Sequence, residues 1–255
     1  MRYIRLSIEY DGTDYHGWQS QKSGGTIQDI ITDKIRELTG ESVRLTGASR
    51  TDAGVHALDQ VAVFETSSYL KTEVIMRALN AKLPPDIRIL NAAEADKDFH
   101  PRYRALKKSY FYIISEGRRH SAFLHGYIWY LHAPLDLERM SEAASLLIGE
   151  HDFSSFRASG CGSKHPVRTV YSAEISRQRE MKFMTATFEG DFIRFRIEAN
   201  AFLRHMVRNI AGTLVEVGKG QITLEQFKEV LLARDRTIAG PTAPAQGLFL
   251  EKIIY

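Results

Sequence analysis

The sequence predicts an α+β fold made of two halves, each with the split β-α-β order of a ferredoxin-like domain. Segments of alternating polar and apolar residues, typical of half-buried strands, are interleaved with helical segments in both halves. The first half gives the order β-α-β-β-α-β, and the second repeats it loosely without repeating the sequence. The 255 residues, 44% hydrophobic and 25% charged, suit one large or two smaller globular domains.

Periodicity and capping residues define the elements of the first half. Residues 2–10 alternate polar and apolar side chains, as expected for a strand with one buried face. Thr26 precedes apolar residues at helical spacing and has Asp29 three positions later, an N-cap pattern, and Gly40 suits the helix end. The other predicted elements are a helix from Thr72 that ends before Pro84, and strands at 42–47, 59–66 and 87–93.

The second half begins after irregular chain near residue 105, which gives predicted domains of 1–105 and 106–255. The irregular charged segments 98–105 and 151–167 are candidate binding loops, because functional residues are frequent in such loops. The predicted elements are strands at 107–115, 168–178, 183–189, 192–199 and 247–254, and helices over 137–148, over 202–217 and from Thr223.

Composition excludes several classes of protein. Cys161 is the only cysteine, so neither an intrachain disulfide nor a cysteine-rich zinc site can form. We find no signal peptide and no apolar run long enough to cross a bilayer, and we expect a cytoplasmic protein. His16, His56 and His100 lack the spacing of a metal motif, and no P-loop or dinucleotide fingerprint occurs. We therefore expect no metal and no small-molecule cofactor.

The densest group of reactive side chains lies at residues 47–57, Gly-Ala-Ser-Arg-Thr-Asp-Ala-Gly-Val-His-Ala. Its small residues allow sharp turns and the close approach of a substrate. Arg50 lies two residues before Asp52, and a nearby guanidinium keeps a carboxylate ionised. An ionised, partly desolvated aspartate can act as a nucleophile or a base. The alternative is a solvated turn with a surface ion pair.

An arginine lies inside the apolar helical stretch at 202–217. Phe202, Met206 and Asn209 fall roughly on one face of this predicted helix, and an apolar face adjoins them, so the helix should be largely buried. Arg208 then needs a partner, because an unpaired buried charge is costly, and Asp52 is a reasonable one. The alternative is an arginine whose stem reaches solvent.

Two tyrosines share one face of the predicted strand at 107–115. Tyr110 and Tyr112 follow Lys107 and Lys108 in the sequence. Aromatic side chains among lysines suit stacking on a base that has left an RNA helix. The alternative is a tyrosine packed within a sheet.

Basic residues gather in several groups, two of them in the candidate binding loops. Each group alone is typical of a solvated face, and the net charge of +3 is a weak indicator of a polyanion partner. Together the groups favour contacts with phosphates. They are Arg102, Arg104, Lys107 and Lys108; Arg118, Arg119 and His120; Arg157, Lys164, His165 and Arg168; and Arg204 with Arg208.

Residues 47–57 resemble the motif Gly-Arg-Thr-Asp-Ala-Gly-Val-His-Ala of the tRNA pseudouridine synthase A family, with Ser49 in place of the usual glycine. Residues 202–214 are similar to the family's Phe-Leu-x-x-Met-Val-Arg-x-Ile-x-Gly-Thr-Leu. The segment at 98–105 resembles Phe-His-Ala-Arg-Tyr-Ser-Ala, from which Pro101 and Arg104 depart. With further similar segments at 155–168 and 240–250, the resemblance covers nearly the whole chain.

The resemblance implies the pseudouridine synthase fold, in which two ferredoxin-like halves join mainly antiparallel sheets. It implies a homodimeric isomerase that converts uridines at positions 38–40 of the tRNA anticodon arm to pseudouridine, without a cofactor. Asp52 would be the nucleophile, supported by Arg50 and paired with Arg208. The family places a tyrosine of Lys-x-Tyr-x-Tyr against the target uridine, and of the two candidates we choose Tyr110.

Further tRNA contacts are predicted at Arg102, Arg157, Arg168 and His56. Two functions of other classes remain open from the residues alone. One is a non-catalytic RNA-binding module on the same fold. The other is a metal-independent hydrolase in which Asp52 and His56 act together as the general base. Such an enzyme would release a product, so the mass of the RNA would change.

Overall fold

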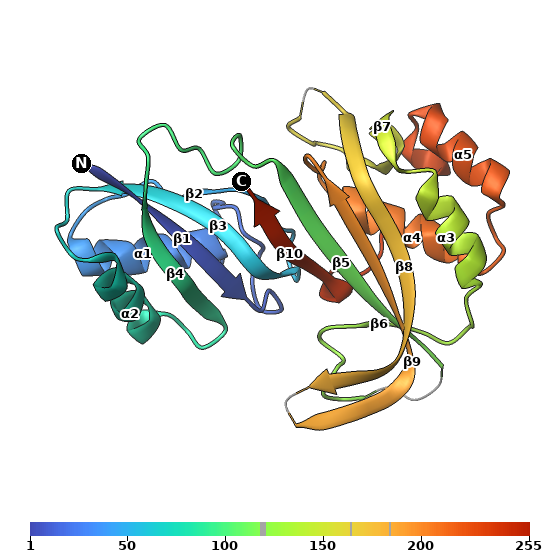
Figure 1. The fold of residues 1–255 in the computed structure, drawn as a ribbon, viewed down its shortest axis with the longest axis horizontal. Coiled ribbons are helices and arrows are strands. Elements are labelled where there is room, and N and C mark those ends of the chain that lie inside the picture. Colours follow the sequence, from blue (N-terminus) through green and yellow to red (C-terminus); the bar gives the residue numbers. More distant parts are fainter. Residues whose placement is uncertain (118–120, 164, 184) are drawn as a thin grey trace. The chain divides into compact units, whose positions relative to one another are not determined.

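The computed structural model describes residues 1–117, 121–163, 165–183 and 185–255. Contacts divide the chain into two compact units (Figure 1), unit 1 with Met1–Leu106 and Phe249–Tyr255, and unit 2 with Lys107–Leu248. Both units combine helices with strands that are mainly antiparallel, which confirms the predicted α+β class. Within the described residues, none of the helices has the length and apolar character needed to cross a membrane.

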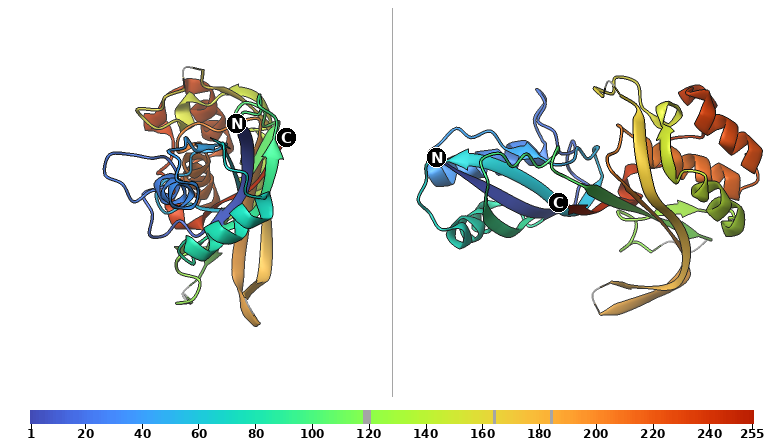
Figure 2. Two further views of the ribbon diagram at one scale, coloured as in Figure 1. Left: turned by 90° about the vertical axis from the view of Figure 1, so that its left-hand side faces the viewer. Right: turned by 45° about the horizontal axis from the view of Figure 1, so that its top comes forward.

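Unit 1 has the predicted order β-α-β-β-α-β. Strand β1 lies between β4 and β3 and is antiparallel to both, while β2 pairs with β3. The two helices pack beside each other on one face of these strands (Figure 2). The elements are β1 (Arg2–Tyr10), α1 (Ile27–Thr39), β2 (Thr46–Gly47), β3 (His56–Thr66), α2 (Thr72–Lys82), β4 (Ile87–Ala95) and β10 (Leu248–Ile254).

The core of unit 1 follows from the periodicities of β1 and α1. Every second residue of β1 from Ile4 to Tyr10 is buried, and α1 buries an isoleucine at each turn. Burial of one such side chain contributes about 1.5–3 kcal/mol relative to exposure. The predicted caps of α1 are confirmed, because Thr26 accepts a hydrogen bond from the backbone of Asp29 and Gly40 has a left-handed φ of 74°.

Strand pairing in unit 1 differs from the prediction in three places. The strand expected at 42–47 is limited to Thr46–Gly47, the residues that pair with β3. Strand β3 begins at His56 instead of residue 59, because its first residues pair in parallel with Phe249 and Leu250. The last strand therefore belongs to unit 1, whereas the sequence had placed it in the second domain.

Unit 2 has antiparallel strands in the order β5-β9-β8-β7, with the short β6 parallel to β5. Its helices gather on one side of the strands (Figures 1 and 2). The elements are β5 (Lys107–Glu116), β6 (Trp129–Leu131), α3 (Leu137–Ser145), β7 (Gly149–Asp152), β8 (Val167–Phe183), β9 (Ala186–Ala199), α4 (Met206–Gly218) and α5 (Leu224–Ala233), with 3-10 turns at Ser154–Phe156, Arg236–Ile238 and Ala245–Gly247.

Several boundaries in unit 2 also differ. The strands expected at 183–189 and 192–199 form one strand, β9, because its pairing with β8 continues past the polar residues near Gly190. Helix α4 begins at Met206 instead of residue 202, because His205, at the N-cap position, adopts a left-handed φ of 60° that interrupts the helix. Strands β6 and β7 were not predicted, since segments of three and four residues carry too little periodicity.

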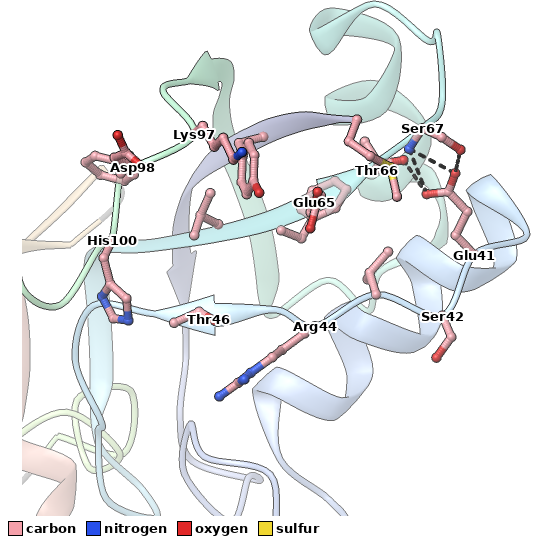
Figure 3. Close-up of a pocket in the computed structure, with 16 residues that line it drawn as sticks. Glu41, Ser42, Arg44, Thr46, Glu65, Thr66, Ser67, Lys97, Asp98 and His100 are labelled. Carbon is pink, nitrogen blue, oxygen red and sulfur yellow. Dashed lines mark hydrogen bonds between the residues drawn. The ribbon is translucent and has the colours of Figure 1, made fainter.

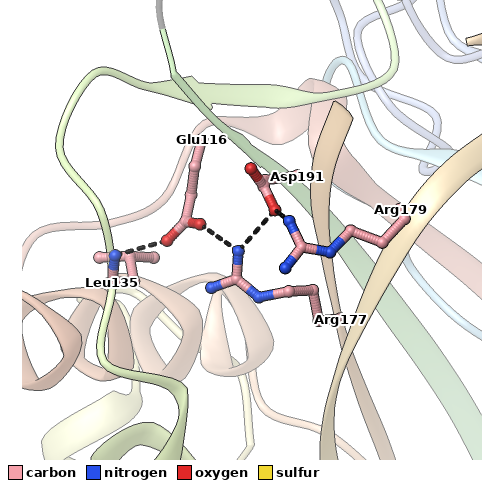
Figure 4. Close-up of polar contacts among 5 residues, drawn as sticks. All are labelled: Glu116, Leu135, Arg177, Arg179 and Asp191. Atoms are coloured by element: carbon pink, nitrogen blue, oxygen red, sulfur yellow. Dashed lines mark hydrogen bonds and ion pairs between the residues drawn. The ribbon is translucent and has the colours of Figure 1, made fainter. Parts of the chain in front are cut away.

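A charged network ties the long β8–β9 hairpin to β5 (Figure 4). Glu116 on β5 lies opposite Asp191 on β9, an arrangement in which like charges repel. The Arg177 guanidinium on β8 resolves this, because its Nη1 lies 2.8 Å from a carboxylate oxygen of each. Arg179 also pairs with Asp191, and Glu116 accepts a hydrogen bond from the backbone of Leu135, which precedes α3.

Candidate active site

The segment that carries Asp52 is fixed at its start by buried partners on β3. The backbone N–H of Ala48 donates to the carbonyl of Val61 at 2.8 Å. The fully buried Gln60 amide brackets the next residue, accepting from the N–H of Ser49 at 3.2 Å and donating to its carbonyl at 2.8 Å. The chain therefore leaves the sheet in one defined direction.

The residue before Asp52 is held by both its side chain and its backbone. The Thr51 hydroxyl lies 2.7 Å from the Tyr10 hydroxyl, and its carbonyl accepts from the N–H of Trp18 at 3.1 Å. Gly17 lies against the same carbonyl, since an added Cβ would be 2.6 Å from it. Only glycine permits this approach, and Gly17 has a left-handed φ of 84°.

The chain is equally constrained after Asp52. A turn closes from the N–H of Val55 to the carbonyl of Asp52 at 3.1 Å, with Gly54 at a left-handed φ of 76°. Val55 is buried, and a Cβ on Gly12 would lie 2.1 Å from its carbonyl. Asp52 is half-buried, and the backbone on both sides of it is fixed. A reaction at its carboxylate would therefore require little movement of the backbone. Arg50 is exposed on the same segment.

His56 follows the segment and is 2% exposed. Its Nδ1 lies 3.1 Å from the N–H of Gly12, which donates to it, and 3.0 Å from a carboxylate oxygen of Asp11. A backbone N–H and a carboxylate therefore both face Nδ1. The ring also stacks on Phe249 of β10 at 4.6 Å. These contacts position β3 against β10, and the burial weighs against a general base acting on solvent water.

In unit 2 the predicted arginine of α4 is oriented by a distant segment. The Nε of Arg208 donates to the carbonyl of Ala243 at 2.8 Å, and the N–H of Ala243 donates to the carbonyl of Arg208 at 3.1 Å. The loop before Ala243 presses on α4, since a Cβ on Gly212 would lie 1.7 Å from the carbonyl of Pro241. The Arg208 side chain is half-buried, and its direction is set by this loop.

The two candidate tyrosines are both buried in unit 2, with different contacts. Tyr112 is fully buried and its hydroxyl donates to the carbonyl of Pro244 at 2.5 Å, while burial raises the pKa of Tyr112. Tyr110 is 5% exposed and its ring meets Phe202 edge-on at 5.0 Å. Both tyrosines are therefore buried, and the choice of Tyr110 stays a prediction.

Arg157 lies beside the N-terminal end of α4. On one side the carbonyl of Phe156 accepts from the Asn209 amide at 2.8 Å. On the other the N–H of Ala158 donates to the carbonyl of Arg204 at 3.1 Å. These bonds place Arg157 next to the helix that carries Arg208.

Arg168 is the second residue of β8, and its side chain bonds to the segment that precedes the strand. Its Nη1 donates to the carbonyl of His165 at 2.8 Å and its Nη2 to the hydroxyl of Ser163 at 3.0 Å. The next residue, Thr169, donates its N–H to the side chain of Asn200 at 3.1 Å. Among the predicted residues of unit 2, Tyr110 contacts Phe202, and Arg208 lies in the same stretch, 200–209. Arg157 and Arg168 are next in sequence to residues that bond to this stretch.

The remaining basic residues divide into exposed and committed side chains. Arg102 and Arg104 are exposed in unit 1. Lys107 lies 3.0 Å from Glu198 and over the ring of Tyr171, and Lys108 is 5% exposed. The predicted contacts at Arg118, Arg119, His120 and Lys164 lie outside the described residues.

A cavity of about 720 Å³ opens on unit 1 (Figure 3). Its described lining includes Arg44, Lys97 and His100 but none of the residues predicted for the active site. At one end Glu41 accepts hydrogen bonds from Thr66 and Ser67, while His100 lies at the other. Over the described stretches of the chain, no cluster of three or more histidine, cysteine or acidic side chains could hold a metal ion.

Sequence reasoning missed the residues that immobilise the Asp52 segment. Gln60, Tyr10 and Gly17 were not singled out, although each constrains a residue between Ser49 and Thr51 or the backbone around it. One signal was available for Gln60, since a glutamine in an apolar strand is costly to bury unless its amide is bonded. Nothing in the sequence indicates which backbone group such an amide would find.

Comparisons with known proteins match the chain over almost its full length. The family model described as tRNA pseudouridine synthase matches residues 6–104 and 143–255. The chain is 47% identical over 255 residues to a tRNA pseudouridine synthase A of Thermoanaerobacter sp. (strain X514) and to one of Acetivibrio thermocellus, covering 100% of each sequence. It is 41% identical over 252 residues to a tRNA pseudouridine synthase A of Thermodesulfovibrio yellowstonii, covering 99% of both.

Proposed function

Because the chain belongs to the tRNA pseudouridine synthase A family, we propose that it isomerises uridines at positions 38–40 of the tRNA anticodon arm, with Asp52 as the nucleophile. The activity itself is that of a tRNA pseudouridine synthase, an isomerase. In this reaction the bond from uracil N1 to C1′ breaks, a bond from C5 to C1′ forms, and the C5 hydrogen exchanges with solvent. The mass of the RNA is unchanged.

The role of Asp52 as nucleophile is supported by its position in the immobilised segment of unit 1. A nucleophile works best when its position is fixed before the substrate arrives, and the neighbours of Asp52 on both sides are held by buried partners. In this proposal Arg50 and Arg208 support the Asp52 carboxylate through their positive charge. Tyr110 stacks on the target base once that base has left its helix.

In this proposal Arg102, Arg157 and Arg168 make further contacts with tRNA phosphates. Exposure of Arg102 supports its part most directly. The burial of His56 supports a positioning role through β3 instead of a direct contact with tRNA. We also propose a homodimer, for which sedimentation should give twice the chain mass of 29.0 kDa.

Mapping the product tests the proposal. Unmodified tRNA transcripts with uridine at positions 38, 39 and 40, singly or together, are incubated with the protein, and pseudouridines are located by carbodiimide-dependent primer extension. New stops confined to these positions, with unchanged RNA mass, support it. Stops elsewhere would move the target, and a released base or fragment would favour the hydrolase. Bound but unmodified tRNA across all transcripts would favour the binding module.

A further inference from the structure

The turn at residues 100–104 in unit 1 presents an aromatic ring to solvent. The N–H groups of Tyr103 and Arg104 both donate to the carbonyl of His100, at 3.2 and 3.0 Å, which forms one helical turn. The centroids of the His100 and Tyr103 rings lie 4.3 Å apart in a tilted contact, as expected for positions three residues apart on a helical turn. Tyr103 nevertheless remains 77% exposed, so the imidazole covers only a small part of its ring.

The inner side of the same turn is firmly anchored. Pro101 is buried, and its carbonyl accepts a hydrogen bond from the hydroxyl of Tyr255 at 2.9 Å. The ring of Phe99 packs 5.0 Å from that of Tyr255, and the guanidinium of Arg5 lies 5.8 Å from the centre of the Phe99 ring. Because other residues hold the turn in place, the fold does not require the exposed ring of Tyr103.

The charge of the turn suits a polyanion. Residues 100–104 include two arginines, both exposed, and no carboxylate. The nearest acidic residues along the chain, Asp96 and Asp98, precede Phe99, whose side chain packs on the anchored side. An exposed aromatic ring flanked by guanidinium groups combines a stacking surface with phosphate ligands, which is the chemistry that single-stranded nucleic acid requires.

We propose that this turn is a second tRNA contact, in which the open face of Tyr103 stacks on an unpaired base other than the target uridine and Arg102 and Arg104 bind the adjoining phosphates. The inference rests on the proposed function, because it takes tRNA as the partner. It assigns the turn a task that Asp52 and Tyr110 do not perform, namely holding the substrate instead of reacting with it. Loss of Tyr103 therefore weakens binding and leaves the chemical step unchanged.

The experiment compares Tyr103→Ala and Tyr103→Phe with Tyr69→Ala, a matched control at a second tyrosine of unit 1 that is 96% exposed. The Kd is measured by filter binding with tRNA whose target uridines are replaced by cytidine. The maximal single-turnover rate is measured separately with reactive tRNA. We expect Tyr103→Ala to raise the Kd about tenfold, the usual effect of losing one stacked base, with an unchanged maximal rate. Tyr103→Phe keeps the ring and should bind as wild type does.

The arginines are tested through salt dependence. Replacing Arg102 and Arg104 together by glutamine should reduce the slope of log Kd against log salt by about 1.5, the value for two lost phosphate contacts. The matched control is Arg36→Gln, at an exposed arginine of α1. Urea midpoints equal to that of wild type confirm that each variant is folded.

Three results would overturn the inference. Binding by Tyr103→Ala equal to that of Tyr69→Ala would exclude stacking, and equal losses in Tyr103→Ala and Tyr103→Phe would assign the effect to the hydroxyl. A changed sedimentation coefficient with an unchanged Kd would make the turn a protein interface. Failure of the proposed function can be told apart from failure of this inference. In the first case wild type would form no pseudouridine, but the Kd values of the variants could still be compared.

Discussion

At the scale of single residues, the backbone around Asp52 is held in place by side chains outside its own segment, among them Gln60 and Tyr10. The sequence alone identified Asp52 as the candidate nucleophile, because a short motif carries that information locally. It did not identify Gln60, whose role depends on meeting the backbone of Ser49 eleven positions earlier. Contacts of this kind follow from strand register, which a sequence pattern specifies only after the partner strand is known.

Gln60→Leu tests whether the bracket around Ser49 positions Asp52. The substitution keeps the volume but leaves the N–H and carbonyl of Ser49 without their partner, which should lower the free energy of unfolding by about 1–3 kcal/mol. A small displacement of the nucleophile should lower the single-turnover rate by about 10- to 100-fold with an unchanged Kd for tRNA. Urea unfolding and tritium release from C5-labelled tRNA measure the two effects.

Asn80→Leu is the matched control for that prediction. The Asn80 amide brackets Ile89 in the same manner, with bonds of 2.8 and 2.9 Å, but at a place in unit 1 away from the Asp52 segment. It should lose a similar stability and keep its rate. Equal rate losses in both variants would show that general destabilisation, and not the position of Asp52, explains the effect.

At the scale of elements, most helices and strands followed from periodicity and caps, while their ends depended on partners. Helix α4 was expected to start at residue 202 but starts at Met206, where His205 takes a left-handed conformation. An apolar pattern continues across such a break, so it predicts burial better than it predicts helix. The loop at 240–243, which lies against α4 and orients Arg208, could not be placed from sequence because it carries no period.

Gly212→Ala tests the packing of that loop on α4. Alanine in a helix interior is ordinarily more stable than glycine by about 1 kcal/mol. Here the added Cβ would lie 1.7 Å from the carbonyl of Pro241, so the loop must move. We expect a net loss of about 1–3 kcal/mol in unfolding free energy and a lower rate, because Ala243 would no longer orient Arg208.

Gly162→Ala provides the comparison, since nothing lies within 4 Å of a Cβ built at that glycine. It should leave the urea midpoint unchanged. If Gly212→Ala instead stabilised the protein, as helix propensity alone predicts, the close contact between α4 and the loop would be contradicted.

The hydrogen bonds between Glu41, which follows α1, and the end of β3 should make the stability of the protein depend on pH. Hydrogen bonds from Ser67 and then Thr66 lower the pKa of Glu41 from its ordinary value of 4.5. A lowered folded-state pKa contributes stability above the unfolded pKa, and this is lost as the pH falls through the folded value. The urea midpoint of wild type should exceed that of Glu41→Gln near neutral pH, and the difference should shrink on titration from about pH 6 to about pH 3. A constant or growing difference would contradict the assignment.

At the scale of the whole molecule, the α+β class and the β-α-β-β-α-β order of unit 1 were predictable, because each element has a recognisable pattern within its own segment of sequence. The return of the final strand to unit 1 was not. Its pattern predicts a strand, but its partner is β3, nearly two hundred positions away, through the pairs of Phe249 with His56 and Leu250 with Ala57. Long-range pairing of this kind is decided by which edge remains open once the local elements have formed.

Formation of pseudouridine through Asp52 is tested most directly by the fate of the hydrogen at C5 of uridine. Unmodified tRNA labelled with tritium at C5 of uridine is incubated with wild type and with Asp52→Asn, both shown to bind the same tRNA and to share one urea midpoint. We expect tritium release to water by wild type and none above background by Asp52→Asn. Equal release by both proteins would contradict the role of Asp52, and no release by wild type from any tRNA that it binds would contradict the proposed reaction.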